Sequence, residues 1–392
     1  MSAHSRKRFA SVEALRRFRP ETLAEFLRRF PSYIAAHGLQ LPPNAAEPDI
    51  RYDKLVPLCM DISPDAPTEF QSALFFISAM GSPARREEIE AEAKYRGVTI
   101  ATHPGCTDHD YAMLTWLQYP DLLEQAYARA AMHQRRTFTY FTIPDDEIKS
   151  FKLPTEERRA RAEKDINLWF SSSDCGIGAK LIVYPGDPET WFLIRHGEKP
   201  NRIPAVDDQG QGFSFFFRPE KYDVVIYNSR YGELKANAGK RLLDDYRYKF
   251  ADLLFEKAWI FSKRALFTLD PLRTNDPAAI SWGAAPEIQS VKLTEVRYEL
   301  PGSHGTTVTV RSNDLFAEQR PDKPIIPPNA ILVREARFEV RFRDSKAPRS
   351  VVIKEGNVAS YSCDSDSAAL EVWMRDRRFI RSWREQGDAK AA

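Results

Sequence analysis

The stretch Lys180-Leu-Ile-Val-Tyr-Pro-Gly-Asp-Pro-Glu-Thr-Trp-Phe-Leu-Ile-Arg195 decides the fold class. Two apolar runs, residues 180–184 and 190–195, flank Pro185-Gly-Asp-Pro188, which has the composition of a tight turn. Such a turn joins antiparallel strands, because a parallel connection needs about a dozen residues or more. We therefore predict a hairpin here and antiparallel pairing in the sheet that contains it.

Strand signals continue towards the C-terminal end of the chain. Candidate strands at 213–217, 223–227 and 233–237 are separated by turn-forming segments, and a helical pattern follows at 238–257. Two more hairpins are expected within 291–311 and 331–353. Residues 336–343 alternate strictly between apolar and charged side chains, so one face of that strand is core and the other is basic.

The first third of the chain has the periodicity of helices instead. Pro20 opens a segment whose apolar residues recur at helical spacing as far as Gly38, and similar patterns follow at 68–80, 83–97, 108–117 and 120–134. The predicted class is α+β: an all-helical domain at 1–136, a largely antiparallel sheet domain with packing helices at 137–330, and a C-terminal hairpin and helix at 331–392 packed on the sheet domain.

Composition narrows the class of protein. The 392 residues carry a net charge of only +2, so no global field attracts the chain to nucleic acid, although local basic patches remain possible. No apolar run approaches the roughly 20 residues that cross a bilayer, and the N-terminus has no apolar segment typical of a secretory signal. The four cysteines are scattered without a Cys-x-x-Cys pair, which argues against a disulfide framework or a zinc ribbon and favours reduced thiols. We expect a cytoplasmic protein without membrane contact.

Residues 193–198, Leu-Ile-Arg-His-Gly-Glu, resemble the first catalytic motif of the histidine phosphatases. The resemblance implies that His196 attacks a phosphoryl group while Arg195 neutralises its oxygens, and that His304 supplies a second pocket histidine. Two prolines follow within 199–204, however, and the sheet of that family is largely parallel. We favour the alternative that the motif is the polar end of a central strand.

A second catalytic interpretation concerns Asp223, Glu233 and Lys235. Their spacing resembles the Asp…Glu-x-Lys pattern of the PD-(D/E)XK nucleases, which implies that the two carboxylates hold a divalent metal and that the lysine polarises the attacking water. The alternative is a hairpin with solvent-facing charges. Apart from that metal, the sequence does not indicate a cofactor.

Two basic regions are candidates for nucleic-acid contact. Arg337, Arg341 and Arg343 lie on one face of an expected strand, and a basic side chain there can neutralise phosphates or simply protect a sheet from aggregation. Arg16 and Arg17 belong to an N-terminal segment with an excess of positive charge, which also fits a solvated helix face.

Over most of its length the chain resembles an uncharacterised bacterial protein family of similar size. The resemblance is carried by residues 70–80, 116–124, 191–197, 218–223 and 232–237. It implies a bacterial protein and no particular activity. We expect a binding or assembly component that contacts nucleic acid or a protein partner encoded nearby, in a setting such as genome or phage defence. The competing class is a phosphoryl-transfer enzyme acting through His196 or through a metal at Asp223 and Glu233.

Overall fold

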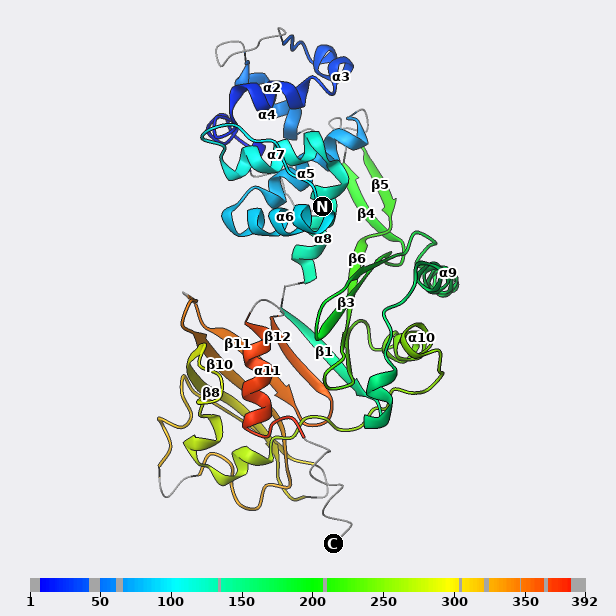
Figure 1. Ribbon diagram of the computed structural model, residues 1–392. Helices are drawn as coiled ribbons and strands as arrows, with labels where there is room; N and C mark the ends of the chain where they lie inside the picture. The colour runs from blue at the N-terminus through cyan, green and yellow to red at the C-terminus, as the bar shows by residue number, and fades with distance from the viewer. Residues whose placement is uncertain are drawn as a thin grey trace. The chain divides into compact units, whose positions relative to one another are not determined.

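A computed structural model of the chain describes residues 8–41, 50–60, 66–132, 135–206, 210–302, 305–320, 324–345, 347–362 and 366–381 (Figure 1). It divides into two compact units, Met1–Met132 and His133–Ala392. The first unit is helical, and the second is built on an antiparallel sheet with interspersed helices. The predicted α+β class is confirmed.

The first unit contains helices with ordinary start and stop signals. Proline occupies the first turn of several of them, where its missing N–H is not needed, and Gly97 ends one with a left-handed backbone. Thr107 and Asp110 form a reciprocal capping box at the start of another. The helices are α1 (Val12–Leu15), α2 (Pro20–Leu27), α3 (Pro31–Ala36), α4 (Tyr52–Met60), α5 (Thr68–Met80), α6 (Pro83–Arg96), α7 (Asp108–Gln118) and α8 (Pro120–Met132).

An aromatic cluster lies at the centre of the first unit. The ring of Phe26 packs against Phe30, Phe70 and Trp116 at centroid separations of 5.3 to 5.8 Å. These residues come from α2, α5, α7 and the turn after α2, so the cluster joins helices that are distant in sequence. Aromatic pairs at this separation add to the stability that burial alone supplies.

The second unit contains one ten-stranded sheet and a separate two-stranded hairpin. The strand order of the large sheet is β2-β3-β6-β7-β1-β12-β11-β10-β8-β9, and every pairing in it is antiparallel. Its strands are β1 (Arg135–Thr142), β2 (Lys180–Tyr184), β3 (Glu189–Gly197), β6 (Glu220–Asn228), β7 (Glu233–Asn237), β8 (Ile288–Glu299), β9 (Thr307–Arg311), β10 (Leu332–Phe342), β11 (Arg349–Lys354) and β12 (Val358–Ser362). Strands β10 to β12, from the segment expected as a separate C-terminal piece, pair inside this sheet.

Two helices cover part of one face of the sheet, which we name the first face. Helices α9 (Glu156–Ser172) and α10 (Leu243–Phe255) share a hydrophobic core with β2, β3, β6, β7 and the end of β1. Phe192 of β3 meets Phe250 of α10 there at a centroid separation of 4.9 Å. A mainly apolar core therefore covers the first face over this half of the sheet.

Helix α11 (Ser367–Asp376) packs on the other, second face. Trp373 of α11 contacts Phe338 of β10 edge to face at 5.3 Å, and Phe379 completes this aromatic group. Figure 1 shows α11 in front of β10 to β12. The short helices η4 (Asp270–Thr274) and η5 (Pro277–Ile280) lie between α10 and β8 in the chain, and η3 (Asp145–Ser150) follows β1.

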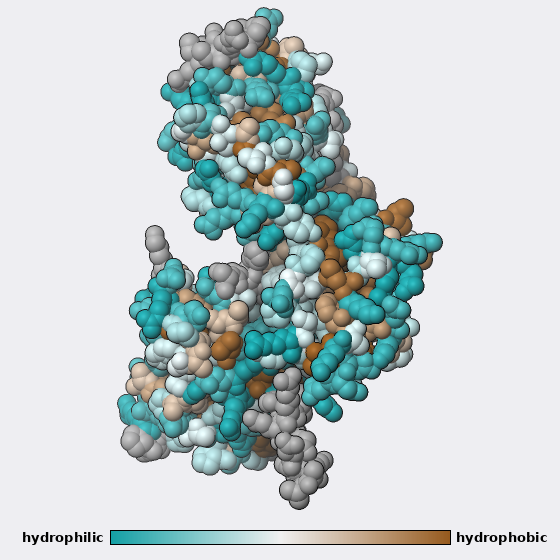
Figure 2. Space-filling view, in the orientation of Figure 1, coloured by the Kyte–Doolittle hydropathy of each residue, from teal (hydrophilic) through white to brown (hydrophobic). Residues whose placement is uncertain are grey.

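Strands β4 (Asn201–Val206) and β5 (Gly212–Phe217) form a hairpin that is not part of the large sheet. Several of its apolar side chains are exposed, among them Ile203, Val206 and Phe216. Figure 2 shows that hydrophilic residues cover most of the visible face of the second unit and that hydrophobic residues gather in a few patches. No helix among the described residues has the length and apolar composition needed to span a bilayer.

Candidate functional site

Strand β3 contains the first three residues of the Arg-His-Gly-Glu motif. It stays paired with β6 as far as Gly197, so Arg195 and His196 are consecutive residues of a regular strand. Consecutive side chains of a strand project to opposite faces. Arg195 accordingly lies near Glu220, with 3.9 Å between Nε and Oε2, whereas His196 projects to the first face. The structure does not bring Arg195 and His196 into one phosphate pocket, and His304 lies outside the described residues.

His196 is buried, and both of its ring nitrogens have partners within the protein. Only 5% of the residue is exposed, and its ring stacks on Phe170 with 4.1 Å between centroids. Nδ1 lies 2.8 Å from the carbonyl oxygen of Gly197, and Nε2 lies 3.1 Å from Oδ2 of Asp223. A histidine nucleophile needs one ring nitrogen directed at the phosphorus atom. Both nitrogens of His196 are engaged within the protein.

Tyr246 of α10 completes this buried polar group. Its hydroxyl donates to Oδ2 of Asp223 at 3.0 Å. Burial, and then the charge of Asp223, raises the pKa of Tyr246 well above its ordinary value, so the hydroxyl keeps its proton and remains a donor. His196 also borders a depression of about 380 Å³ that Cys175 and Lys221 help to line. The hydrogen bonds among His196, Asp223 and Tyr246 link β3 and β6 to α10, the helix that covers them.

Asp223 and Glu233 lie on adjacent strands but on opposite faces of the sheet. The pairs Val225 with Ala236 and Ile226 with Lys235 fix the register between β6 and β7. Asp223 shares the first face with Val225, while Glu233 and Lys235 project to the second face. The metal site that the nuclease pattern implies is therefore not assembled from these three residues. Within the described part of the chain, no three His, Cys, Asp or Glu side chains are placed to hold a metal ion.

Glu233 and Lys235 are also not solvent-facing, because both are buried beneath α11. The ammonium of Lys235 lies 2.8 Å from Glu189 and 2.6 Å from Glu371, and it also donates to the hydroxyl of Tyr361 at 3.3 Å. Buried charges persist in proteins when they are paired and hydrogen-bonded in this way. The cluster fastens α11 to the second face of the sheet.

Arg375 of α11 makes the second contact of this cluster. Its Nη2 lies 2.6 Å from Glu233, and its guanidinium stacks 3.5 Å from the centre of the Tyr231 ring. Burial raises the pKa of Glu233 although Arg375 opposes the shift. Burial also acts to raise the pKa of Glu371, but Lys235, Tyr361 and Arg375 outweigh it and hold that pKa below its ordinary value. Sequence spacing could not reveal these partners, which lie more than 100 residues apart in three cases.

The first face continues beyond α9 and α10 and can be followed through the cross-strand pairs. Ala236 of β7 belongs to the core under those helices and pairs with Thr139 of β1. Thr137 shares that face and pairs with Ser360 of β12, with 2.7 Å between their hydroxyl oxygens. From there the row continues through Val352, Arg337, Glu295 and Arg311. These arginines therefore project from the face opposite α11.

We name this part of the first face the open face. Its charged first-face side chains, from β8 to β11, are Lys292, Glu295, Arg297, Glu299, Arg311, Arg334, Glu335, Arg337, Glu339, Arg341 and Lys354, and Ser350 lies among them. Seven of these side chains are cationic and four are anionic, which leaves an excess of three positive charges. Lys292, Arg297 and Arg341 are exposed, and their side chains make no hydrogen bond or ion pair with any residue that the structure describes.

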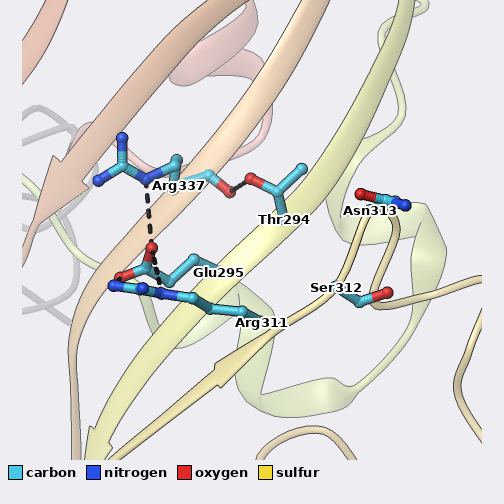
Figure 3. Close-up of a pocket in the computed structure, with 6 residues that line it drawn as sticks. All are labelled: Thr294, Glu295, Arg311, Ser312, Asn313 and Arg337. Atoms are coloured by element: carbon cyan, nitrogen blue, oxygen red, sulfur yellow. Dashed lines mark hydrogen bonds and ion pairs between the residues drawn. The ribbon is translucent and has the colours of Figure 1, made fainter.

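The open face is hollowed where β8, β9 and β10 meet. A shallow depression of about 620 Å³ is lined by Glu295, Arg311 and Arg337 and by the polar side chains of Thr294, Ser312 and Asn313 (Figure 3). An adjoining depression of about 590 Å³ extends towards Lys292 and Ser350. The surface is thus concave, polar and cationic at the same place.

The predicted basic residues are distributed over both units. Arg337 and Arg341 lie on the open face, whereas Arg343 follows β10 and donates to the carbonyl oxygen of Pro286 at 2.7 Å. Arg16 stacks 5.5 Å from the ring centre of Tyr52, and Arg17 lies 3.7 Å from Glu13, both in the first unit. Sequence reasoning missed Lys292, Arg297 and Arg311, although the alternation of charged and apolar residues in 291–297 and 307–311 was the signal that could have found them.

Comparison of the chain with models of known protein families gave no match, and comparison with curated proteins gave none either.

Proposed function

We propose that the chain is a binding or assembly component that contacts nucleic acid through the open face. The observation that carries this proposal is the excess of three positive charges on a half of the sheet that presents exposed polar side chains. Cations that neutralise phosphates release condensed counterions, and this release supplies most of the affinity of sequence-independent binding. The whole chain carries only +2, so the local arrangement of charge is what favours a polyanion.

The open face favours the phosphate backbone over the bases. Its cations stand beside polar side chains, those of Ser312 and Asn313, whose hydroxyl and amide groups can donate to phosphate oxygens. None of the side chains that define the open face is aromatic, so it offers no platform on which bases stack. We therefore expect binding with little dependence on base sequence.

A direct binding measurement tests the proposal. Fluorescence anisotropy with labelled single-stranded DNA, duplex DNA and RNA at low salt should show binding by the unmodified chain. The double variant Arg337→Ala/Arg341→Ala should bind at least about tenfold more weakly, because each lost phosphate contact weakens binding for all sequences.

The control removes the same charge from another part of the second unit. Lys152 and Lys164 are exposed and lie before and on α9. The double variant Lys152→Ala/Lys164→Ala should bind like the unmodified chain. Equal losses in both double variants would show that net charge, and not the open face, determines binding. A role in genome or phage defence and a protein partner encoded nearby remain predictions from the sequence.

A further inference from the structure

Two arginines of the open face share one carboxylate. Oε2 of Glu295 lies 3.0 Å from Nε of Arg311 in an ion pair and accepts a hydrogen bond from Nε of Arg337 at 3.3 Å. Oε1 of Glu295 also accepts from Nη2 of Arg311 at 3.3 Å. The side chain of Glu295 is 11% exposed, while those of Arg337 and Arg311 are 37% and 72% exposed. A mostly buried carboxylate therefore anchors two guanidiniums at the surface.

This anchoring leaves donors of both guanidiniums available. The two Nη atoms of Arg337 make no hydrogen bond with the described residues, and Figure 3 shows them turned away from Glu295. The contacts of Arg311 use Nε and Nη2 and leave Nη1. Guanidinium groups fixed in this way match the oxygen geometry of phosphate, whereas a lysine ammonium acts only as a point charge.

We propose that Arg311 and Arg337, oriented by Glu295, form a phosphate subsite in the depression between β8, β9 and β10. This inference rests on the proposed function for its macromolecular ligand, but the shared chemistry is that of a phosphate group. The group can be a backbone diester or a terminal monoester of nucleic acid. Glu295 acts as a positioning residue, and guanidinium geometry contributes to affinity beyond the net charge.

The first test compares conservative variants in oligonucleotide binding at one salt concentration. Arg337→Lys and Arg311→Lys keep the charge and should weaken binding about three- to tenfold, because they lose the fixed fork of donors. The matched control Arg241→Lys, at an exposed position between β7 and α10 and outside the open face, should change affinity less than about twofold. Oligonucleotides with and without a terminal phosphate distinguish the monoester from the backbone diester.

The variant Glu295→Gln separates the subsite from a simple effect of charge, because the two predict opposite changes in binding affinity. The substitution removes one negative charge from the depression, so charge alone predicts tighter binding. The subsite predicts weaker binding, by about threefold or more, because the two guanidiniums lose their charged anchor. Tighter binding by Glu295→Gln, together with Arg337→Lys binding like the unmodified chain, would overturn the proposal.

A second arm separates this inference from the proposed function. Inorganic pyrophosphate alone should raise the thermal midpoint of the unmodified chain, and Arg337→Lys should lose that increase while keeping its own fold by circular dichroism. If nucleic acid does not bind but the pyrophosphate effect is lost in Arg337→Lys, the proposed function fails and the subsite stands. If nucleic acid binds but neither the lysine variants nor Glu295→Gln weaken binding, the subsite fails and the function stands. Failure of both arms rejects both.

Discussion

The ammonium nitrogen of Lys235 in β7 lies 2.6 Å from Oε1 of Glu371 in α11, and both side chains are buried. The pair joins two elements that are separated by 136 positions in the sequence. Burying either charge alone is costly, so the pair holds only while both partners are present. The position of α11 on the sheet therefore depends on a polar contact as well as on the packing of Trp373.

Replacement of the lysine should reveal this dependence. Lys235→Met keeps an unbranched side chain but leaves Glu189 and Glu371 without their shared cation, so we expect a loss of about 3–5 kcal/mol in the free energy of unfolding. Urea denaturation measures it. The control Lys164→Met, at an exposed position, should stay within about 0.5 kcal/mol of the unmodified chain. A Lys235→Met protein as stable as the control would show that the buried cluster contributes no net stability.

The two glutamates of the cluster should respond to pH with opposite signs. The pKa of Glu371 is held below the ordinary value of 4.5, so its contribution to stability is present above that pH and is lost as the pH falls through the lowered pKa. The stability gap between the unmodified chain and Glu371→Gln should therefore shrink on acidification.

For Glu233 the expected change in stability with pH is the opposite. Burial raises the pKa of Glu233, so the folded state retains the proton to a higher pH than the unfolded chain does. The contribution of the protonated carboxyl group to stability is therefore lost as the pH rises through that raised pKa. The gap between the unmodified chain and Glu233→Gln should shrink as the pH increases from about 4 to 7 in urea denaturation series. Parallel pH profiles for the two variants would contradict this assignment.

The hydroxyl of Tyr246 should contribute to stability through Asp223. Tyr246→Phe removes the donor to a buried carboxylate, and hydrogen bonds to charged groups are worth about 1.5–3 kcal/mol. Tyr248 lies on the same helix and is 43% exposed, so Tyr248→Phe is a matched control that should change the free energy of unfolding little. Denaturation curves of the two variants at neutral pH decide whether the buried donor matters.

The engagement of both ring nitrogens of His196 predicts that the purified chain does not hydrolyse p-nitrophenyl phosphate. His196→Ala should instead lower stability by several kcal/mol, about 3 or more, because it removes the ring stacked on Phe170 and leaves Asp223 with one donor fewer. A steady-state phosphatase assay with both proteins is the check. Turnover by the unmodified chain that disappears in a folded His196→Ala protein would restore the phosphatase interpretation.

Local sequence signals predicted much of the fold because turns and periodicity are local. Pro185-Gly-Asp-Pro188 predicts the antiparallel hairpin of β2 and β3, and the alternation of 336–343 predicts which side chains of β10 are buried. The ten-stranded order was not predictable, because the pairing of β1 with β12 joins segments more than 200 residues apart and no short-range pattern encodes it.

The candidate site also combines residues that local sequence patterns predict with residues that only long-range strand pairing brings together. The basic side of β10 follows from alternation, but Glu295, which holds Arg311 and Arg337, is opposite them only through the register of three strands. The motif around His196 misleads for a related reason. A short motif specifies a catalytic site only when the fold brings its side chains together, and regular pairing of β3 with β6 through Gly197 places Arg195 and His196 on opposite faces.

The salt dependence of nucleic-acid binding tests the central claim most directly. Anisotropy titrations at several salt concentrations give the slope of log affinity against log salt, which is about −0.9 for each phosphate neutralised on duplex DNA. We predict that Arg337→Ala/Arg341→Ala makes this slope shallower by about two, while Lys152→Ala/Lys164→Ala leaves it unchanged. An unchanged slope in the Arg337→Ala/Arg341→Ala protein, or no salt-dependent binding by the unmodified chain, would contradict the assignment of the open face to nucleic acid.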